Sequence, residues 1–170
     1  FDTIDFWIDE FDIDGIRLDC ADCLEGFFVE EMRRRVDAKK SDFWLMGEVI
    51  HGNYGSYISD TKLNSVTDYQ LHKGLYSGHN DHNYFEIAHT VRYLFGIGGQ
   101  CPNTHLYSFV DNHDVDRLAS KVNIPQHMKL IYTLIYTLPG IPSIYYGSEW
   151  GIEGKKEGAS DDAMRPALDV

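Results

Sequence analysis

Positive charge is scarce in this sequence. Its 15 Lys and Arg residues stand against 27 Asp and Glu residues, which gives a formal net charge of −12 at pH 7 and a pI near 4.9. A chain this acidic is repelled by nucleic acid phosphates and by anionic membrane surfaces. We therefore expect no nucleic acid and no membrane among its partners, whereas a neutral substrate is compatible with the charge.

Cysteine is also scarce, and a long uninterrupted apolar run is absent. Three cysteines cannot all pair within one chain, and Cys20 and Cys23 have no second pair that would complete a zinc site. We expect no metal site from them, and unpaired thiols favour a cytoplasmic over a secreted location. The most apolar stretch, residues 130–146, is broken by two prolines and a glycine, so it is not a membrane span.

The spacing of apolar residues alternates between helical and strand periods. A chain of 170 residues, 43% of them apolar, can bury one core, and strands that alternate with helices predict an α/β fold with a parallel sheet. The expected strands are residues 13–19, 43–49, 65–71, 106–113 and 141–147. The expected helices are residues 1–11, 24–36, 54–61, 85–95 and 125–138. In the second helix, Phe27 and Met32 share the apolar face, and Arg33 and Arg34 the charged one.

The stretch DGIRLDCADC, residues 14–23, places two charges in an apolar strand. Because side chains alternate along a strand, Arg17 and Asp19 lie on one face and Ile16 and Leu18 on the other. A buried charge is destabilising unless it is paired, so one interpretation is a structural ion pair. The other interpretation is a functional site.

Polar residues at the ends of other strands favour the functional interpretation. Each of them stands at the C-terminal end of a predicted strand: Asp19, Glu48, Asn112, His113 and Asp114. Parallel α/β sheets bind their ligands at that edge. A structural ion pair explains polar residues at the end of one strand but not at the ends of three strands. The pattern therefore predicts a catalytic cleft.

The carboxyl groups of Asp19 and Glu48 suit cleavage of a glycosidic bond. If their strands are neighbours, about 4.8 Å apart, the groups lie near the separation of about 5 to 5.5 Å that retaining glycosidases use. Arg17 would then keep Asp19 ionised as a nucleophile, and Glu48, among apolar neighbours, would keep its proton as an acid. Asp114 would stabilise positive charge in the transition state, or would cap a loop or helix.

Four motifs make the sequence similar to the α-amylase family, glycoside hydrolase family 13. DGIRLD (14–19), GEV (47–49), FVDNHD (109–114) and GIPSIYYGSEWG (140–151) resemble the family's segments at strands four, five, seven and eight. Each motif is weak alone, but the four in this order are specific. The resemblance identifies residues 1–170 as the C-terminal part of the family's catalytic domain, a partial TIM (β/α)8 barrel of strands four to eight with their helices.

The resemblance implies a retaining glycoside hydrolase that acts on α-1,4-linked glucans such as starch and maltodextrins. It implies Asp19 as the nucleophile, Glu48 as the general acid/base and Asp114 as the transition-state stabiliser. It assigns contacts with the oligo- or polysaccharide substrate to residues that flank these three: Arg17, His51, Asn112, His113 and Arg117.

Two departures from the family pattern matter. Many members carry His or Glu four residues after the nucleophile, preceded by Lys or Asn, where this chain has Cys23 and Asp22. This departure alters the acceptor contacts and the calcium ligation that some amylases make from that segment. We therefore expect no cofactor with this chain, and calcium only with the full-length protein. The strand-three motif is also missing. We expect the chain alone, with open edges at strands 13–19 and 141–147, to be inactive and to self-associate or pair with the missing half barrel.

Other functions stay open at this point. Within the family, the alternatives are an α-1,6-glucosidase, a neopullulanase-like enzyme or a transglycosylase, since hydrolysis and glycosyl transfer share one covalent intermediate. A non-catalytic relative that serves as a binding subunit is a second alternative, which the retention of Asp19, Glu48 and Asp114 disfavours. A parallel α/β binding module with buried ion pairs is a third, which the four ordered motifs disfavour.

Overall fold

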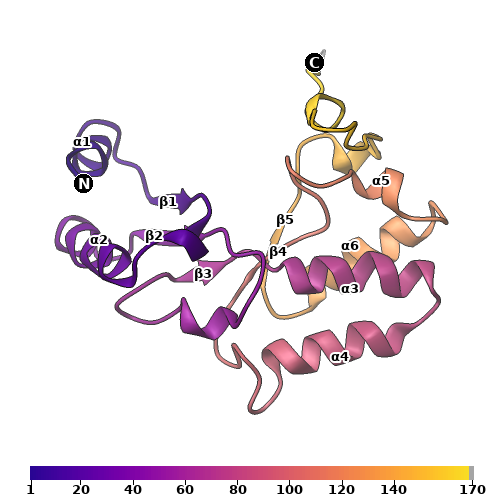
Figure 1. Cartoon of the computed structure of the whole chain (residues 1–170), viewed down its shortest axis with the longest axis horizontal. Coiled ribbons are helices and arrows are strands. Elements are labelled where there is room, and N and C mark those ends of the chain that lie inside the picture. The colour runs from indigo at the N-terminus through magenta and orange to yellow at the C-terminus, as the bar shows by residue number, and fades with distance from the viewer. Residues whose placement is uncertain (169–170) are drawn as a thin grey trace. The chain divides into compact units, whose positions relative to one another are not determined.

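A computed structural model describes residues 1–168 of the chain (Figure 1). The chain divides into two compact units, one formed by Phe1–Thr67 and one that begins at Asp68. None of the helices within residues 1–168 has the length and apolar character needed to cross a membrane. The strands are parallel and alternate with helices, which confirms the predicted α/β class.

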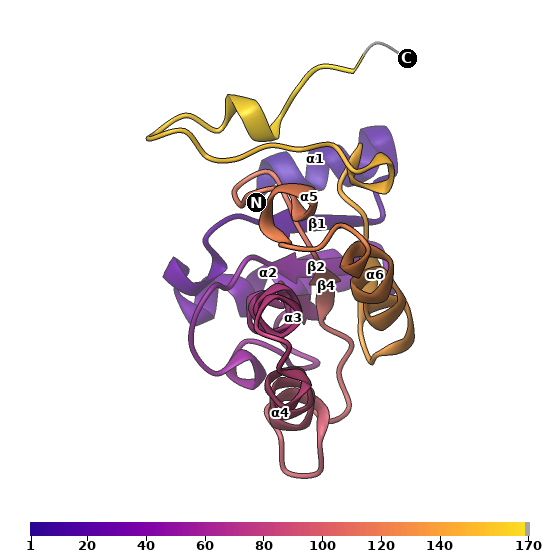
Figure 2. The same cartoon turned by 90° about the vertical axis from the view of Figure 1, so that its right-hand side faces the viewer.

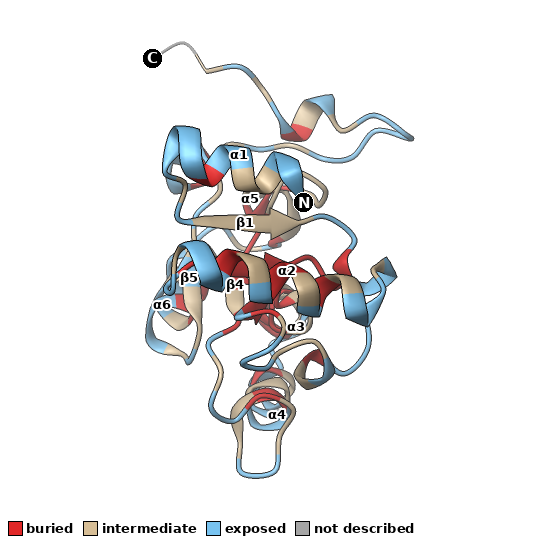
Figure 3. Ribbon diagram, turned by 90° about the vertical axis from the view of Figure 1, so that its left-hand side faces the viewer, coloured by how far each residue is buried: buried red, intermediate tan, exposed pale blue. Residues whose placement is uncertain are grey.

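The first unit contains a three-stranded parallel sheet in the order β1-β2-β3. Its elements are α1 (Asp2–Phe11), β1 (Gly15–Leu18), η1 (Ala21–Cys23), α2 (Gly26–Lys39), β2 (Trp44–Gly47), η2 (Tyr54–Ser56) and β3 (Ser65–Val66). β2 is buried apart from its first residue, whereas all four residues of β1, at the edge of the sheet, are only partly buried (Figure 3). The predicted helix 54–61 is a single short turn.

The register of β1 and β2 aligns the ends of the two strands. Leu18 pairs with Gly47, so Asp19 and Glu48 both follow directly after paired residues. Gly47 is required there, because a Cβ atom on it would lie 2.5 Å from Leu63 Cδ1 and 2.7 Å from the Ala21 Cβ. The close packing around Gly47 thus fixes the level at which Glu48 leaves the sheet.

Helix α2 buries a residue that the sequence pattern places on its charged face. Arg33 is only 4% exposed and donates hydrogen bonds to the Asn64 Oδ1 (2.8 Å) and to the Phe43 carbonyl oxygen (2.8 Å). It also forms an ion pair with Asp37 at 2.5 Å. Phe27, in contrast, is 73% exposed. The predicted faces of this helix are therefore wrong at both positions, because a buried arginine is favourable when its donors are paired.

We expect the substitution Arg33→Leu to lower the free energy of unfolding by about 2 kcal/mol, because it removes the hydrogen bonds to the Phe43 carbonyl oxygen and to Asn64 Oδ1 and the ion pair with Asp37. Arg34→Leu is the matched control. Its side chain is 66% exposed and pairs only with Glu31, so its loss is expected to change stability by less than about 0.5 kcal/mol. Urea denaturation of the two variants measures the difference, and equal midpoints would contradict the structural role of Arg33.

The second unit contains a two-stranded parallel sheet and a set of helices. Its elements are α3 (Tyr69–Asn80), α4 (Tyr84–Phe95), β4 (Tyr107–Phe109), α5 (Leu118–Lys121), α6 (His127–Thr137), β5 (Ile141–Ser143), η3 (Ser148–Trp150) and η4 (Asp162–Met164). β4 pairs with β5, with Tyr107 opposite Ile141. Helices α3 and α4 run side by side as a hairpin (Figure 2).

Helix α3 replaces most of a predicted strand. The expected strand 65–71 ends at Val66, and the helix begins at Tyr69. Asp68 starts the helix as its N-cap, since its carboxylate accepts a hydrogen bond from the Leu71 backbone N–H at 2.9 Å. Leu71 and Leu75, one helical turn apart, are both buried.

Burial raises the pKa of the Asp68 carboxyl to about 7. Because this value lies above that of the unfolded chain, the folded state holds a proton that the unfolded state has lost, and stability falls as the pH rises from about 4 to about 7. Asp68→Asn keeps a capping side chain without an ionisable group. We expect this variant to gain about 1 to 3 kcal/mol of stability at pH 8 and almost nothing at pH 4.

Chemical denaturation of Asp68→Asn at the two pH values tests this expectation. The substitution Asp60→Asn, at an exposed position, serves as the control and should change stability by less than about 0.5 kcal/mol at either pH. A gain for Asp68→Asn that is the same at pH 4 and pH 8 would show that the carboxyl does not titrate in this range.

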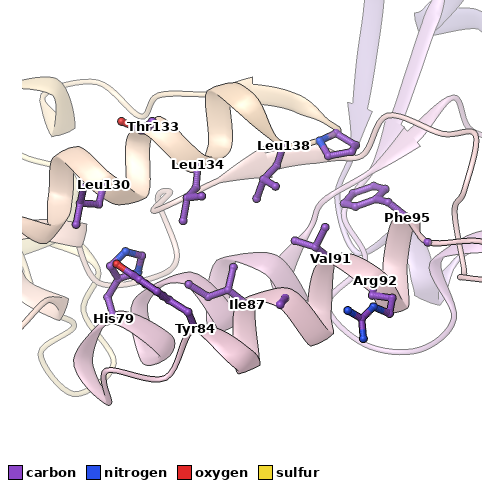
Figure 4. Close-up of a pocket in the computed structure, with 13 residues that line it drawn as sticks. His79, Tyr84, Ile87, Val91, Arg92, Phe95, Leu130, Thr133, Leu134 and Leu138 are labelled. Carbon is purple, nitrogen blue, oxygen red and sulfur yellow. The ribbon is translucent and has the colours of Figure 1, made fainter.

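An apolar groove of about 650 Å³ separates α4 from α6. Leu130, Leu134 and Leu138 face it from the segment of α6, and Ile87 and Val91 face it from α4 (Figure 4). A groove lined in this way offers hydrophobic contacts but no carboxylates for bond cleavage. The candidate catalytic residues therefore lie elsewhere.

Candidate active site

The first unit brings Arg17, Asp19 and Glu48 together at the C-terminal ends of β1 and β2. Arg17 Nη1 lies 2.6 Å from Asp19 Oδ1, and Arg17 Nη2 lies 3.0 Å from Glu48 Oε1. One carboxylate oxygen of Asp19 lies within 4.8 Å of one of Glu48. The prediction that the two carboxyl groups follow neighbouring strands and lie close together is confirmed.

The two carboxylates have different surroundings. The Asp19 side chain is 73% exposed, and the hydrogen bond and the positive charge of Arg17 hold its pKa below the usual value, as the sequence predicts. The Glu48 side chain is only 7% exposed. The motif suggests purely apolar neighbours for Glu48, but the structure differs. One carboxyl oxygen contacts Arg17, and the other accepts a hydrogen bond from the Cys20 backbone N–H at 3.2 Å.

Cys20 contacts both carboxylates, a role that the sequence does not reveal. Its backbone is left-handed, with φ of 42°, which directs its N–H to Glu48, and its thiol donates to Asp19 Oδ2 at 3.7 Å. The charge of Asp19 raises the pKa of the thiol, so Cys20 is a weak nucleophile. Asp19, Cys20 and Glu48 offer ligand atoms for a cation, but the guanidinium of Arg17 is already bound to both carboxyl groups.

The second unit places Asn112, His113 and Asp114 in the loop after β4. Asn112 Oδ1 accepts the backbone N–H of Asp114 at 2.8 Å and so fixes the turn. His113 Nε2 lies 3.0 Å from one Asp114 oxygen, and Arg165 pairs with the other at 2.9 Å. Arg165, 51 residues further along the chain, carries no motif that would have identified it.

Arg117 is not a cleft residue, and the structure corrects that prediction. Its side chain is fully buried and donates to the carbonyl oxygens of Met164 (2.9 Å) and Tyr146 (2.6 Å) and to Ser148 Oγ (3.0 Å). With its donors directed into the protein, Arg117 cannot contact a sugar. Its proximity to Asp114 in the sequence is misleading, because the chain turns inward between the two residues.

Asp111 is a further buried acid in the same motif. It accepts hydrogen bonds from the Leu118 backbone N–H at 2.8 Å and from Ser148 Oγ at 2.7 Å, and burial raises its pKa. These contacts are all within the protein. Asp111 thus organises the loop that carries Asp114 and does not face a substrate.

The remaining predicted positions lie on the surface. His51 is exposed in the loop after β2, and Asp22 and Cys23 are exposed around η1. The single carboxylate of Asp22 does not match the donor set of calcium, which takes about six to eight oxygen ligands. A calcium site that used this segment would therefore need further oxygen ligands from other parts of the protein.

The comparisons with known proteins agree with the motifs. Residues 1–169 match the family described as "Alpha amylase, catalytic domain". The chain belongs to this family.

Its relatives include enzymes named for α-glucan substrates. A maltogenic alpha-amylase of Bacillus acidopullulyticus is 28% identical over 89% of this chain, and a cyclomaltodextrinase of Geobacillus thermopakistaniensis is 30% identical over 90% of it. The crystal structure of an alpha-amylase from Geobacillus thermoleovorans in complex with acarbose matches 99% of the chain with a TM-score of 0.79 and 30% identity, and the match covers 39% of that structure. The chain spans 26% of the length of the two curated relatives.

Proposed function

We propose that this chain forms part of a retaining glycoside hydrolase that cleaves α-1,4-linked glucans. The observation that carries the proposal is the pair of carboxylates, Asp19 and Glu48, with oxygens within 4.8 Å of each other and with Arg17 bound to both. This spacing fits a nucleophile and an acid/base that act without a water molecule between them. Room for such a water would need a separation of about 6.5 to 9.5 Å. The names of the relatives support an α-glucan as substrate.

In the first step, Asp19 attacks the anomeric carbon and Glu48 donates a proton to the departing glycosidic oxygen. Asp19 suits this role because Arg17 keeps it ionised. The products are a glycosyl ester on Asp19 and a sugar with a new hydroxyl group. The same contact that lowers the pKa of Asp19 also holds its oxygen in a fixed direction.

In the second step, Glu48, now ionised, removes a proton from a water molecule that attacks the anomeric carbon. The ester bond to Asp19 breaks, and Glu48 is protonated again for the next cycle. Two displacements on one carbon retain the α configuration. Arg17 lies beside Glu48 in both steps, so its charge can stabilise the ionised form that the second step requires.

We assign to Asp114 the stabilisation of positive charge in the transition state, and to His113, Asn112 and His51 contacts with sugar hydroxyl groups. Arg165 supports this assignment, because its ion pair at 2.9 Å holds the Asp114 carboxylate in one orientation. We place the chain in a TIM barrel, with β1 as strand four and β5 as strand eight, and expect it to need the rest of the barrel for activity. The position of β1 at the edge of the sheet supports that need.

The test is the hydrolysis of soluble starch and maltoheptaose by the full-length protein, with the anomer of the first product read by NMR. The expected result is the α-anomer as the first product. Release of the β-anomer would refute the retaining mechanism. Turnover of α-1,6-linked but not α-1,4-linked glucans would favour the alternative of an α-1,6-glucosidase.

A further inference from the structure

The loop that carries Asp114 is held by a side chain from the start of α3. Both ends of the Asn112 amide group take part in this contact. Its Oδ1 accepts the backbone N–H groups of Asp114 at 2.8 Å and of Val115 at 3.1 Å, and its Nδ2 donates to the Tyr69 hydroxyl oxygen at 3.1 Å. Tyr69 thus anchors the turn that sets the direction in which the Asp114 side chain leaves the backbone.

The hydroxyl group of Tyr69 has a defined position, because the start of α3 is bound to β4. The Asp68 backbone N–H donates to the Tyr107 carbonyl oxygen at 2.9 Å, and the Asp68 carboxyl group caps the helix through the Leu71 N–H. The Tyr69 ring meets the buried Phe109 ring edge-on, with centroids 4.9 Å apart. A side chain that is held at its backbone and at its ring presents its hydroxyl oxygen in one place.

Asp114 therefore has two kinds of support, which act on different atoms. His113 and Arg165 contact its carboxylate oxygens at 3.0 and 2.9 Å, whereas Asn112 binds its backbone N–H. Electrostatic stabilisation of a transition state requires groups that are fixed before the reaction, and a displacement of about 1 Å can slow a reaction about 10²-fold. The ion pairs orient the side chain, and the backbone support determines the point from which it extends.

We propose that Tyr69 is a positioning residue, which acts through Asn112 to hold Asp114 where positive charge develops in the transition state. This inference rests on the proposed function, because it gives Tyr69 a task in the same reaction. Tyr69 itself does not contact the substrate in this role. An amide group has two N–H donors, so Asn112 can bind Tyr69 with one of them and a sugar hydroxyl group with the other.

The substitution Tyr69→Phe in the full-length protein tests the proposal, because it removes one oxygen atom and keeps the ring that packs on Phe109. We expect kcat for maltoheptaose to fall by about 10- to 100-fold and KM to change by less than about twofold, because a misplaced Asp114 weakens binding of the transition state more than binding of the substrate. Tyr136→Phe, at an exposed position of α6, is the matched control and should keep the wild-type kcat. A raised KM with an unchanged kcat in Tyr69→Phe would overturn the proposal, since Tyr69 would then be a substrate contact.

A double-mutant cycle shows whether Tyr69 acts through Asn112. Asn112→Ala removes the acceptor of the Asp114 and Val115 N–H groups together with the contact to Tyr69. In this background, Tyr69→Phe should lower kcat by less than about a further twofold, because the link is already broken. Losses that multiply would show that the two residues act independently, and would overturn the proposal.

Hydrogen exchange gives a measurement that does not depend on catalysis. The N–H groups of Asp114 and Val115 should exchange about 10-fold faster in Tyr69→Phe and at the wild-type rate in Tyr136→Phe, as measured by mass spectrometry of a peptide that spans residues 110–118. Faster exchange in a protein whose wild type does not hydrolyse maltoheptaose would refute the proposed function and support the anchoring role of Tyr69. Unchanged exchange in Tyr69→Phe would overturn that role even if the wild type is active.

Discussion

In the full-length protein, Glu48→Gln is expected to slow the hydrolysis of maltodextrins by about 10²- to 10⁴-fold. The amide preserves the shape of the side chain and its hydrogen bond from the Cys20 backbone N–H, but it can neither donate nor accept the catalytic proton. An α-maltoside with a good leaving group needs no acid in the first step. Its cleavage by the variant should therefore stop at the glycosyl ester of Asp19, which is seen as a burst of leaving group.

Azide gives the comparison that separates the roles of the two carboxylates. As an anion it attacks the ester without a general base, so it should restore turnover of Glu48→Gln and yield an α-glycosyl azide. Asp19→Asn cannot form the ester, and its activity should fall by about 10⁴-fold or more and stay unrestored with the same substrate. Stopped-flow absorbance and NMR of the azide product are the measurements. Rescue of Asp19→Asn but not of Glu48→Gln would show that the two assignments are reversed.

Arg117→Met is expected to lower the free energy of unfolding by about 3 to 5 kcal/mol. The wild-type guanidinium is fully buried, donates to two carbonyl oxygens and to Ser148, and stacks on the Tyr145 ring with a centroid distance of 4.1 Å. Methionine fills part of the volume but leaves these acceptors unpaired and removes the cation near the buried Asp111. Thermal or chemical denaturation of the full-length variant measures the loss.

Two further variants show which property of Arg117 matters. Arg117→Lys keeps the charge but not the planar fork, so its loss of stability should lie between those of the wild type and Arg117→Met. Arg165→Met removes an arginine whose side chain is 43% exposed and should change stability by less than about 1 kcal/mol. A stability of Arg117→Met equal to that of Arg165→Met would contradict the role assigned to Arg117.

The arrangement of Arg17, Asp19 and Glu48 is predictable from the sequence for a simple reason. Strand alternation and the pairing of consecutive parallel strands are local rules, and both carboxylates directly follow residues that pair in β1 and β2. Cys20 escapes prediction because its contribution comes from a backbone N–H in a left-handed conformation. Nothing in the identity of a cysteine signals that geometry.

Arg33 and Arg117 show where sequence reasoning fails. A charged residue in a helical or loop pattern is normally exposed, and only partners far along the chain reverse this expectation. Arg33 is bound by Asn64, 31 residues away, and Arg117 by Met164, 47 residues away. Helix α3 fails for the opposite reason, because its start depends on the single local cap at Asp68, which a weak strand pattern conceals.

The pairing of Leu18 with Gly47 also determines where the chain tolerates a change of length. An added residue between Ser41 and Asp42, both exposed, alters a surface connection between α2 and β2 and leaves the positions of the two strand ends intact. The same insertion inside Trp44–Gly47 shifts every later side chain of the strand by one position, which turns Glu48 to the opposite face of the sheet. The length of this loop can therefore be changed without loss of the carboxylate pair. An insertion or deletion within the four residues of β2 would separate the two carboxylates.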